Sequence, residues 1–219
     1  MKKGLFITFE GIEGSGKSTQ AQLLKEYLVS EGRKVFLTRE PGGPKISEQI
    51  REILLSNENK EMSPETELLL YLAARSQHTS ECIIPALNRG EFVICDRYID
   101  STLAYQGIAR ELNLGTVIDI NEFATYGLKP DLTFILDLPT DLLIYRLLKK
   151  RLDRIESESI EFHNKVREAF LNIAKYDERY IVMDSRDDIY VLHEKIKNII
   201  LNKIQTPHAT IQTNGIIDT

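Results

Sequence analysis

Short runs of neighbouring apolar residues recur along the chain and predict buried β-strands. Within each run, valine, isoleucine, leucine or phenylalanine occupies adjacent positions instead of alternating strictly with polar residues. This pattern is typical of strands that are covered on both faces, as in a parallel sheet. The predicted strands span residues 5–10, 34–39, 92–96, 132–138 and 180–184.

Segments with apolar residues at helical spacing lie between these runs. Near the C-terminal end, for example, Leu192, Ile196 and Ile200 form one apolar stripe. The predicted helices span residues 17–30, 46–55, 64–88, 140–151, 157–178 and 188–204. This alternation of strands and helices predicts an α/β fold with a doubly wound, five-stranded parallel sheet flanked by helices.

A chain of 219 residues has the size of one domain. We expect a single domain over residues 1–204, because the periodic pattern ends there. The tail 205–219 lacks periodicity and contains Pro207 and Gly215, so we expect it to be loosely ordered. The two cysteines, Cys82 and Cys95, are too few for a disulfide framework or a zinc cluster.

Charge and hydropathy narrow the classes of partner. The sequence has 28 Lys and Arg residues against 33 Asp and Glu residues, a net charge of −5, which argues against tight nonspecific binding to nucleic acid. No apolar run approaches the roughly 18 residues of a membrane span. The N-terminal apolar run breaks at Glu10, too early for a signal peptide. We therefore expect a cytoplasmic protein that binds neither nucleic acid nor a membrane.

The clearest chemical signal is the sequence GIEGSGKS at residues 11–18. It matches the phosphate-binding pattern G-x-x-x-x-G-K-[ST] and lies between a predicted strand and a predicted helix. The glycines let backbone amides approach phosphate oxygens, Lys17 supplies a positive charge, and the Ser18 hydroxyl can ligate Mg²⁺. A glycine-rich turn without a ligand is the competing interpretation. The predicted ATP-binding residues are Gly11, Ile12, Glu13, Gly14, Ser15, Gly16, Lys17, Ser18 and Thr19.

This loop predicts the class of ligand but not the phosphoryl acceptor. The Asn-Lys pairs at 59–60, 164–165 and 202–203 lack the Asp two residues later that guanine-binding GTPases use. The sequence also has no LSGGQ stretch of the kind found in transporter ATPases. Together with the short chain, these absences favour a small kinase that transfers the γ-phosphoryl group to a small molecule.

Two further clusters point to the acceptor side. Asp96 and Arg97 end a predicted strand, at the edge where doubly wound sheets bind ligands. We assign Asp96 to the Mg²⁺ shell, through water, and Arg97 to phosphate. Tyr71 and Arg75 lie four residues apart on a predicted helix and share a face. The ring could stack on a base while the guanidinium donates to it; core packing is the competing interpretation for Tyr71.

Taken together, these motifs resemble those of the bacterial thymidylate kinases, in the nucleoside-monophosphate kinase group. The resemblance runs from about residue 3 to residue 201. It rests on FEGIEGSGKST (9–19), TREPGG (38–43), AAR (73–75), DRY (96–98), STLAYQG (101–107), KPDLT (129–133) and LDRIE (152–156). The resemblance implies ATP-dependent phosphorylation of dTMP to dTDP, with Mg²⁺, by a homodimer. The implied dTMP-binding residues are Glu13, Glu40, Pro41, Arg51, Tyr71, Arg75, Arg97, Thr102, Tyr105 and Gln106.

The resemblance also implies individual roles for these side chains. Tyr71, where phenylalanine is usual, would stack on thymine while Arg75 hydrogen-bonds it. Tyr105 would lie against the deoxyribose, where a 2′-hydroxyl group would clash. Glu13 would face the 3′-hydroxyl group, and Arg97 would hold the acceptor phosphate.

Residues 149–157 are predicted to form a short helical lid. Four positive charges lie in KKRLDR at 149–154, although a cationic helix end stabilised by the helix dipole is the competing interpretation. The phosphate-binding loop has no arginine, so the resemblance implies that the lid supplies the catalytic one. Both Arg151 and Arg154 are candidates, and Arg146 would pack on adenine.

Two other functions remain open at this point. One is another small P-loop kinase acting on a different (deoxy)nucleotide or nucleoside. The other is a catalytically silent sensor that binds ATP to control a partner. A sensor needs no acceptor pocket, so the predicted acceptor residues argue against it.

Overall fold

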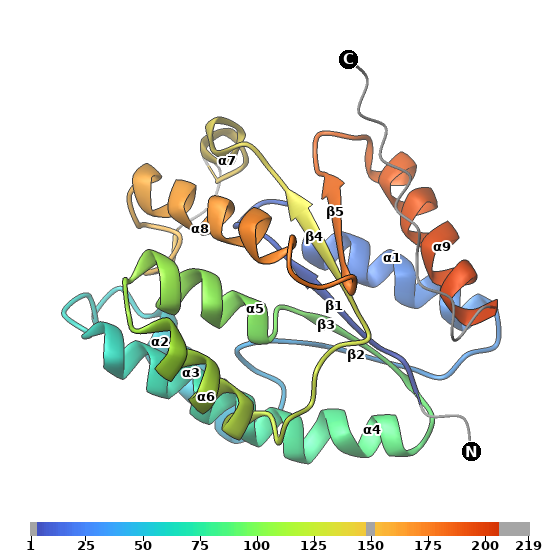
Figure 1. The fold of residues 1–219 in the computed structure, drawn as a ribbon, viewed down its shortest axis with the longest axis horizontal. Coiled ribbons are helices and arrows are strands. Elements are labelled where there is room, and N and C mark those ends of the chain that lie inside the picture. The colour runs from blue at the N-terminus through green and yellow to red at the C-terminus, as the bar shows by residue number, and fades with distance from the viewer. Residues whose placement is uncertain (1–3, 148–151, 206–219) are drawn as a thin grey trace.

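The computed structural model describes residues 4–147 and 152–205. Its centre is a five-stranded sheet with the order β2-β3-β1-β4-β5 (Figure 1), and all neighbouring strands are parallel. The strands are β1 (Phe6–Glu10), β2 (Val35–Arg39), β3 (Phe92–Asp96), β4 (Leu132–Asp137) and β5 (Tyr180–Asp184). The predicted α/β fold with a five-stranded parallel sheet is therefore confirmed.

Helices cover both faces of this sheet (Figure 1). Ile7 and Phe9 of β1 pack in one buried cluster with residues of α1 and α9. Phe6 packs on the opposite face with Ile83 and Leu87. The helices are α1 (Lys17–Ser30), α2 (Lys45–Leu55), α3 (Pro64–His78), α4 (Ile84–Asn88), α5 (Ile99–Thr102), α6 (Leu114–Ala124), α7 (Thr140–Leu147), α8 (Ile160–Ile173) and α9 (Ile189–Gln205), with π-helical turns η1 (Thr79–Ile83) and η2 (Leu103–Ala109). Burial on both faces explains why the strands are apolar at adjacent positions.

The helices differ from the sequence-based expectation in the middle of the chain. The helix predicted over 64–88 is present as α3, η1 and α4 in direct succession. No helix is predicted between 88 and 140, where α5, η2 and α6 lie. Gly107 and Gly115 weaken the helical signal there, and α6 is stabilised by packing of Val117 against α3. The Asn113 side chain, which accepts the N–H of Thr116 as an N-cap, is the local signal that sequence reasoning overlooked.

Parts of the predicted lid and tail lie outside the described residues. These are residues 148–151 and 206–219, whereas residues 154–157 form turns and Gln205 ends α9. Within the described ranges, no helix combines the length and the apolar character needed to cross a bilayer.

The carboxyl ends of three neighbouring strands bring the predicted motifs together. The phosphate-binding loop follows β1, the Glu40-Pro41 pair follows β2, and Arg97 follows β3. The N–H of Glu40 donates to the Asp96 carbonyl at 2.9 Å, which ties the loop after β2 to the end of β3. In parallel sheets this edge is where ligands bind.

Candidate active site

The phosphate-binding loop joins β1 to the start of α1 in a backbone conformation that requires glycine. Gly11 has a φ of 135°, and a Cβ atom there would lie 2.5 Å from the Leu136 carbonyl oxygen. Gly16, with a φ of 92°, is the N-cap of α1 in the left-handed region. The loop therefore delivers the backbone to a helix N-terminus, where amide groups and the helix dipole favour an anion.

Three side chains extend this anion site. Lys17 is 6% exposed, and its Nζ atom donates to the Ile12 carbonyl at 2.7 Å. Burial, followed by the nearby Arg97 cation, lowers the pKa of Lys17 to about 8. The Ser18 hydroxyl donates to an Asp96 carboxyl oxygen at 2.5 Å, so oxygen atoms from α1 and β3 converge beside the loop.

Ser18 and Asp96 provide the kind of ligands that Mg²⁺ prefers, a hydroxyl and a carboxylate oxygen. Across residues 4–147 and 152–205, no group of three or more His, Cys, Asp or Glu side chains could hold a metal ion. A magnesium ion at Ser18 and Asp96 would therefore need further oxygens from bound phosphate and water, which is the usual arrangement for Mg²⁺ in nucleotide sites.

A pocket with a volume of about 260 Å³ lies beside Lys17 and Ser18. This volume is close to the lower end of the roughly 300–1,000 Å³ typical of small-molecule sites. All the residues implied to bind dTMP line it, together with part of the phosphate-binding loop: Glu13, Gly14, Lys17, Ser18, Glu40, Pro41, Arg51, Tyr71, Arg75, Asp96, Arg97, Thr102, Tyr105 and Gln106. Residues from the whole first half of the chain thus meet in one cavity.

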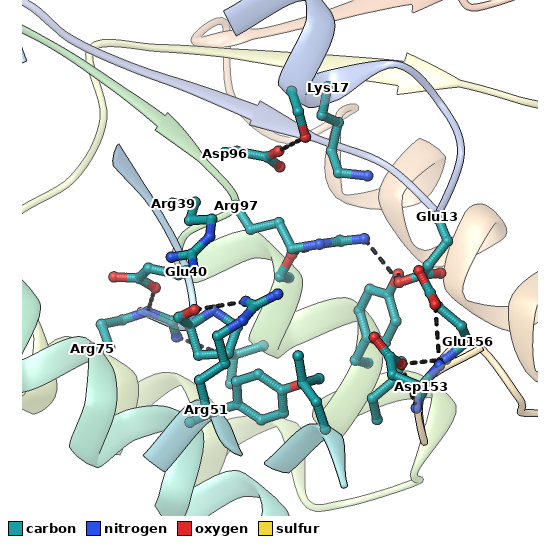
Figure 2. Close-up of a pocket in the computed structure, with 18 of the residues that line it drawn as sticks. Glu13, Lys17, Arg39, Glu40, Arg51, Arg75, Asp96, Arg97, Asp153 and Glu156 are labelled. Atoms are coloured by element: carbon teal, nitrogen blue, oxygen red, sulfur yellow. Dashed lines mark hydrogen bonds and ion pairs between the residues drawn. The ribbon is translucent and has the colours of Figure 1, made fainter. Parts of the chain in front are cut away.

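Arg97 crosses the pocket toward the phosphate-binding loop (Figure 2). Its Nη1 atom donates to the Gly11 carbonyl at 2.9 Å, and its Nη2 atom donates to Glu13 at 2.8 Å. The Tyr105 hydroxyl donates to the same Glu13 oxygen at 2.7 Å. Burial alone would raise the pKa of Glu13, but the Arg97 guanidinium and then His163 and Lys17 hold it well below its usual range. Glu13 is thus a carboxylate at neutral pH.

A second buried pair forms the opposite wall. Arg75 is 2% exposed, and its Nε atom donates to Glu40 at 2.7 Å. Its Nη1 atom donates to the Thr102 hydroxyl and to Asn121, at 2.5 and 2.9 Å. Burial would raise the pKa of Glu40, but Arg75 and His78 hold it below its usual value. These contacts fix the position of the Arg75 guanidinium before any ligand binds.

Charged side chains of both signs line the pocket, and two arginines lie across it from two carboxylates. Figure 2 shows Arg39 and Arg51 on one side and Asp153 and Glu156 on the other. Arg51 donates to the Pro41 carbonyl at 2.7 Å, which directs its guanidinium along the pocket wall. An anionic group would be attracted to the arginine side, and hydroxyl groups could donate to the carboxylates.

The described lid arginine, Arg154, does not line this pocket, although its neighbours Asp153 and Ile155 do. It is 5% exposed and donates to the Leu54 carbonyl at 2.7 Å and to Glu67 at 2.6 Å. Glu67 also accepts hydrogen bonds from Arg110 and Gln106. The catalytic roles predicted for Arg151 and Arg154 stay predictions, because Arg151 lies outside the described residues and Arg154 is held in this buried network.

Arg146, predicted to pack on adenine, contacts the backbone of the phosphate-binding loop. It donates to the Gly14 carbonyl at 2.7 Å and to the Ser185 carbonyl at 3.0 Å. This places its guanidinium beside the loop, and its contact with adenine stays a prediction.

Sequence reasoning did not select several residues that line the pocket: Arg39, Leu55, Ser101, Asp153, Ile155 and Glu156. Arg39 belongs to the TREPGG motif, and Asp153 and Glu156 belong to LDRIE. Membership in these motifs was therefore a signal that could have identified them.

Comparisons with known proteins identify the family of this chain. A family model described as "Thymidylate kinase" matches residues 9–196. A thymidylate kinase of Sulfurihydrogenibium sp. (strain YO3AOP1) is 50% identical over 194 residues, which cover 88% of this chain and 95% of the relative. A thymidylate kinase of Thermosipho africanus is 46% identical over 202 residues, which cover 92% of this chain and 100% of the relative.

A solved structure leads to the same conclusion. The crystal structure of thymidylate kinase from Ehrlichia chaffeensis has a TM-score of 0.74 and 36% sequence identity. The similarity covers 90% of this chain and 99% of that one. Because the fold, the pocket and these relatives agree over most of the chain, this protein belongs to the thymidylate kinase family.

Proposed function

We propose that this protein transfers the γ-phosphoryl group of ATP to dTMP, and that the pocket beside the phosphate-binding loop holds dTMP. One observation carries the proposal: every residue implied to bind dTMP lines the same cavity as Lys17 and Ser18 of the phosphate-binding loop. Donor and acceptor would therefore meet inside one site, as in-line transfer requires.

The chemistry would rest on position and charge. The acceptor phosphate is already an anion, so a strong general base is not required. Lys17 would neutralise charge on the β- and γ-phosphates. Arg97, whose guanidinium bonds the Gly11 carbonyl of the phosphate-binding loop, would hold the acceptor phosphate. Arg51, which lines the pocket, would add positive potential for the same anion, whereas Glu48 balances the charge of Arg39.

The nucleoside would lie against the remaining walls. Tyr71 would stack on thymine while the fixed Arg75 guanidinium donates to it. Glu13, held as a carboxylate, would accept a hydrogen bond from the 3′-hydroxyl group. Tyr105, which is 5% exposed and donates to Glu13, would occupy the space of a 2′-hydroxyl group. This arrangement would select deoxynucleotides.

Mg²⁺ would be held by the Ser18 hydroxyl and, through water, by Asp96. When bound, it would neutralise phosphate charge during transfer. An arginine of the lid, Arg151 or Arg154, would complete the charge neutralisation as the lid closes over ATP. Arg146 would pack on the adenine.

We further propose that the chain acts as a homodimer in the cytoplasm. The neighbouring helices α3 and α6 expose large apolar side chains, among them Leu69, Ile118 and Phe123, which is 85% exposed. Such side chains are typical of interaction surfaces. Light scattering should give twice the mass of the chain, and a Phe123→Glu variant should shift it toward the monomer. A wild-type monomer at working concentration would contradict the dimer.

The test of the proposed reaction is a coupled ADP-release assay with Mg-ATP and a panel of acceptors: dTMP, dUMP, TMP, dCMP, dGMP, AMP and thymidine. The Lys17→Ala variant, purified identically, controls for contaminating kinases. We expect turnover to be fastest with dTMP. Faster turnover with another acceptor would show that the protein is a kinase but would reject the assignment of Tyr71 and Arg75 to thymine. Binding of ATP without turnover on any acceptor would indicate a sensor.

A further inference from the structure

Glu10 is a buried carboxyl group that the proposed reaction does not use. It ends β1 directly before the phosphate-binding loop, is 0% exposed and does not line the pocket. Its two carboxyl oxygens instead reach the segment after β3. One accepts the N–H of Tyr98 at 2.7 Å, and the other accepts the Ser101 hydroxyl at 2.6 Å.

The first of these contacts acts on the backbone of Arg97. Arg97 has a φ of 72°, a left-handed conformation that residues other than glycine rarely adopt. The N–H of Arg97 donates to the Phe9 carbonyl at 2.9 Å, and the next N–H, of Tyr98, donates to Glu10. The end of β1 thus holds the amides on both sides of the Arg97 α-carbon. A conformation of this kind persists only where its surroundings hold it.

The second contact acts on the Arg97 side chain. The Ser101 oxygen that is bonded to Glu10 also accepts a hydrogen bond from Arg97 Nη1, at 3.1 Å. From there the guanidinium reaches Gly11 and Glu13 on the phosphate-binding loop. The connection therefore runs from Glu10 through Ser101 to the group that faces the pocket.

We infer that Glu10 is a positioning residue for Arg97: its carboxyl group fixes both the backbone and the guanidinium of the arginine that would hold the acceptor phosphate. The inference rests on the proposed function for the choice of substrate, whereas the geometry stands independently of it.

The choice of variants follows from the same contacts. Burial, together with Asp100, raises the pKa of Glu10 to about 8. A protonated carboxyl still accepts the Tyr98 N–H at one oxygen and bonds Ser101 at the other, so both contacts survive in either state. A glutamine side chain has the same shape, which makes Glu10→Gln the conservative variant. Glu10→Leu removes both contacts.

Thr8→Val is the matched control. Thr8 lies on the same strand and is also 0% exposed. Its hydroxyl pairs with Thr133 at 2.8 Å and is linked to the segment after β3 only indirectly, through Arg179, which bonds both Thr133 and Asp100. We expect Glu10→Leu to lower kcat/KM for dTMP about tenfold or more, with the KM for ATP changing less than about twofold. Glu10→Gln should keep most of the wild-type kcat/KM for dTMP. Thr8→Val should lower Tm without changing kcat/KM for dTMP.

A double-mutant cycle separates positioning from a general loss of stability. In an Arg97→Ala background there is no guanidinium left to position. Adding Glu10→Leu should therefore lower kcat/KM by less than about a further factor of two. The same tenfold loss in both backgrounds would overturn the inference. If Glu10→Leu does not fold, Ser101→Ala takes its place in the cycle, because it removes only the side-chain contact.

A measurement without substrate keeps the inference distinct from the proposed function. Phenylglyoxal modifies accessible arginines, and mass spectrometry reports the rate at Arg97. We expect faster modification of Arg97 in Glu10→Leu or Ser101→Ala than in the wild type and in Thr8→Val. Faster modification with no turnover on dTMP would reject the proposed function and retain the inference. An unchanged rate would overturn the inference even if dTMP is the substrate.

Discussion

Arg97 and Arg154 were both predicted to act on phosphate, yet the structure places them in different surroundings. The Arg97 side chain is 17% exposed, and its carboxylate partner Glu13 is 11% exposed and lines the pocket. The Arg154 side chain is 5% exposed, and its partner Glu67 is 1% exposed. One guanidinium lies in a ligand cavity, whereas the other lies in a closed network of protein groups.

This difference shows how partners determine what an arginine can do. Arg97 bonds the Gly11 carbonyl, and it also bonds the Ser101 hydroxyl and the Glu13 carboxylate, which both line the cavity. An incoming phosphate could therefore reach Arg97 without any unfolding. To reach a phosphate, Arg154 would have to break its buried ion pair with Glu67. This costs free energy because the Glu67 carboxylate would stay buried with fewer partners.

The lid arginine that reaches the transferring phosphoryl group is expected to have the largest effect. Because Glu67 holds Arg154, we expect Arg151→Ala to lower kcat by about 10³-fold, in the range of an arginine finger. Arg154→Ala should lower kcat much less when both variants are assayed well below their Tm. A larger loss of kcat in Arg154→Ala would mean that Arg154 leaves Glu67 during catalysis.

Glu67→Gln tests the closed network through stability. It leaves Arg154 buried without its counter-charge, so the free energy of unfolding should fall by about 3–5 kcal/mol. Glu13→Gln is the matched change in the pocket. It should lower the free energy of unfolding less, because Arg97 keeps two other acceptors and partial access to water. Urea unfolding measures both. Equal losses would show that the two environments are energetically alike.

Lys17→Ala and Arg97→Ala are each expected to lower kcat/KM by at least about 10²-fold, because both remove positive charge from the transferring phosphate groups. Their midpoints in urea should stay closer to the wild type than that of Glu67→Gln. Near wild-type turnover in either variant would reject the role assigned to that residue.

The affinity for ATP should depend on pH through Lys17. With its pKa lowered to about 8 by burial and Arg97, the free protein loses this charge as the pH rises through 8. If only the cationic form binds, the Kd for ATP rises about tenfold between pH 7 and pH 9. Calorimetric titration of ATP at several pH values measures this Kd. Lys17→Arg, which stays protonated, should have a flat profile, and a flat wild-type profile would contradict the prediction.

Tyr105→Phe is expected to have the smallest effect. It keeps the ring but loses the hydrogen bond to Glu13, so the preference for dTMP over TMP should fall only a few-fold, about the worth of one hydrogen bond. Tyr105→Ala removes the ring and should relax the preference further. Unchanged ratios of kcat/KM in both variants would mean that Tyr105 does not exclude the 2′-hydroxyl group.

The apolar pattern predicted most of the sheet, and the motifs that carry the family resemblance contain most of the residues that line the pocket. The strands were recognisable because burial on both faces makes adjacent positions apolar, and the phosphate-binding loop has a strict pattern between a strand and a helix. Helix α6 was not predicted, because its stability comes from packing of Val117 against α3 and not from a strong local pattern.

The roles of the charged residues were harder to predict, because spacing does not reveal partners. Glu67 and Arg154 are far apart in the sequence, and only the fold brings them within 2.6 Å. Glu10 is one of many acidic residues until its contacts with Tyr98 and Ser101 are known. Which charges face a ligand and which face each other is a property of tertiary structure.

The proposed function requires the pocket to bind dTMP with its phosphate at Arg97. The most direct test is calorimetric titration of dTMP and of thymidine into the wild type and Arg97→Ala. We expect Arg97→Ala to weaken dTMP binding about tenfold or more, the loss of a charge-assisted contact, and to weaken thymidine binding much less. Equal weakening of both ligands, or of neither, would contradict this expectation.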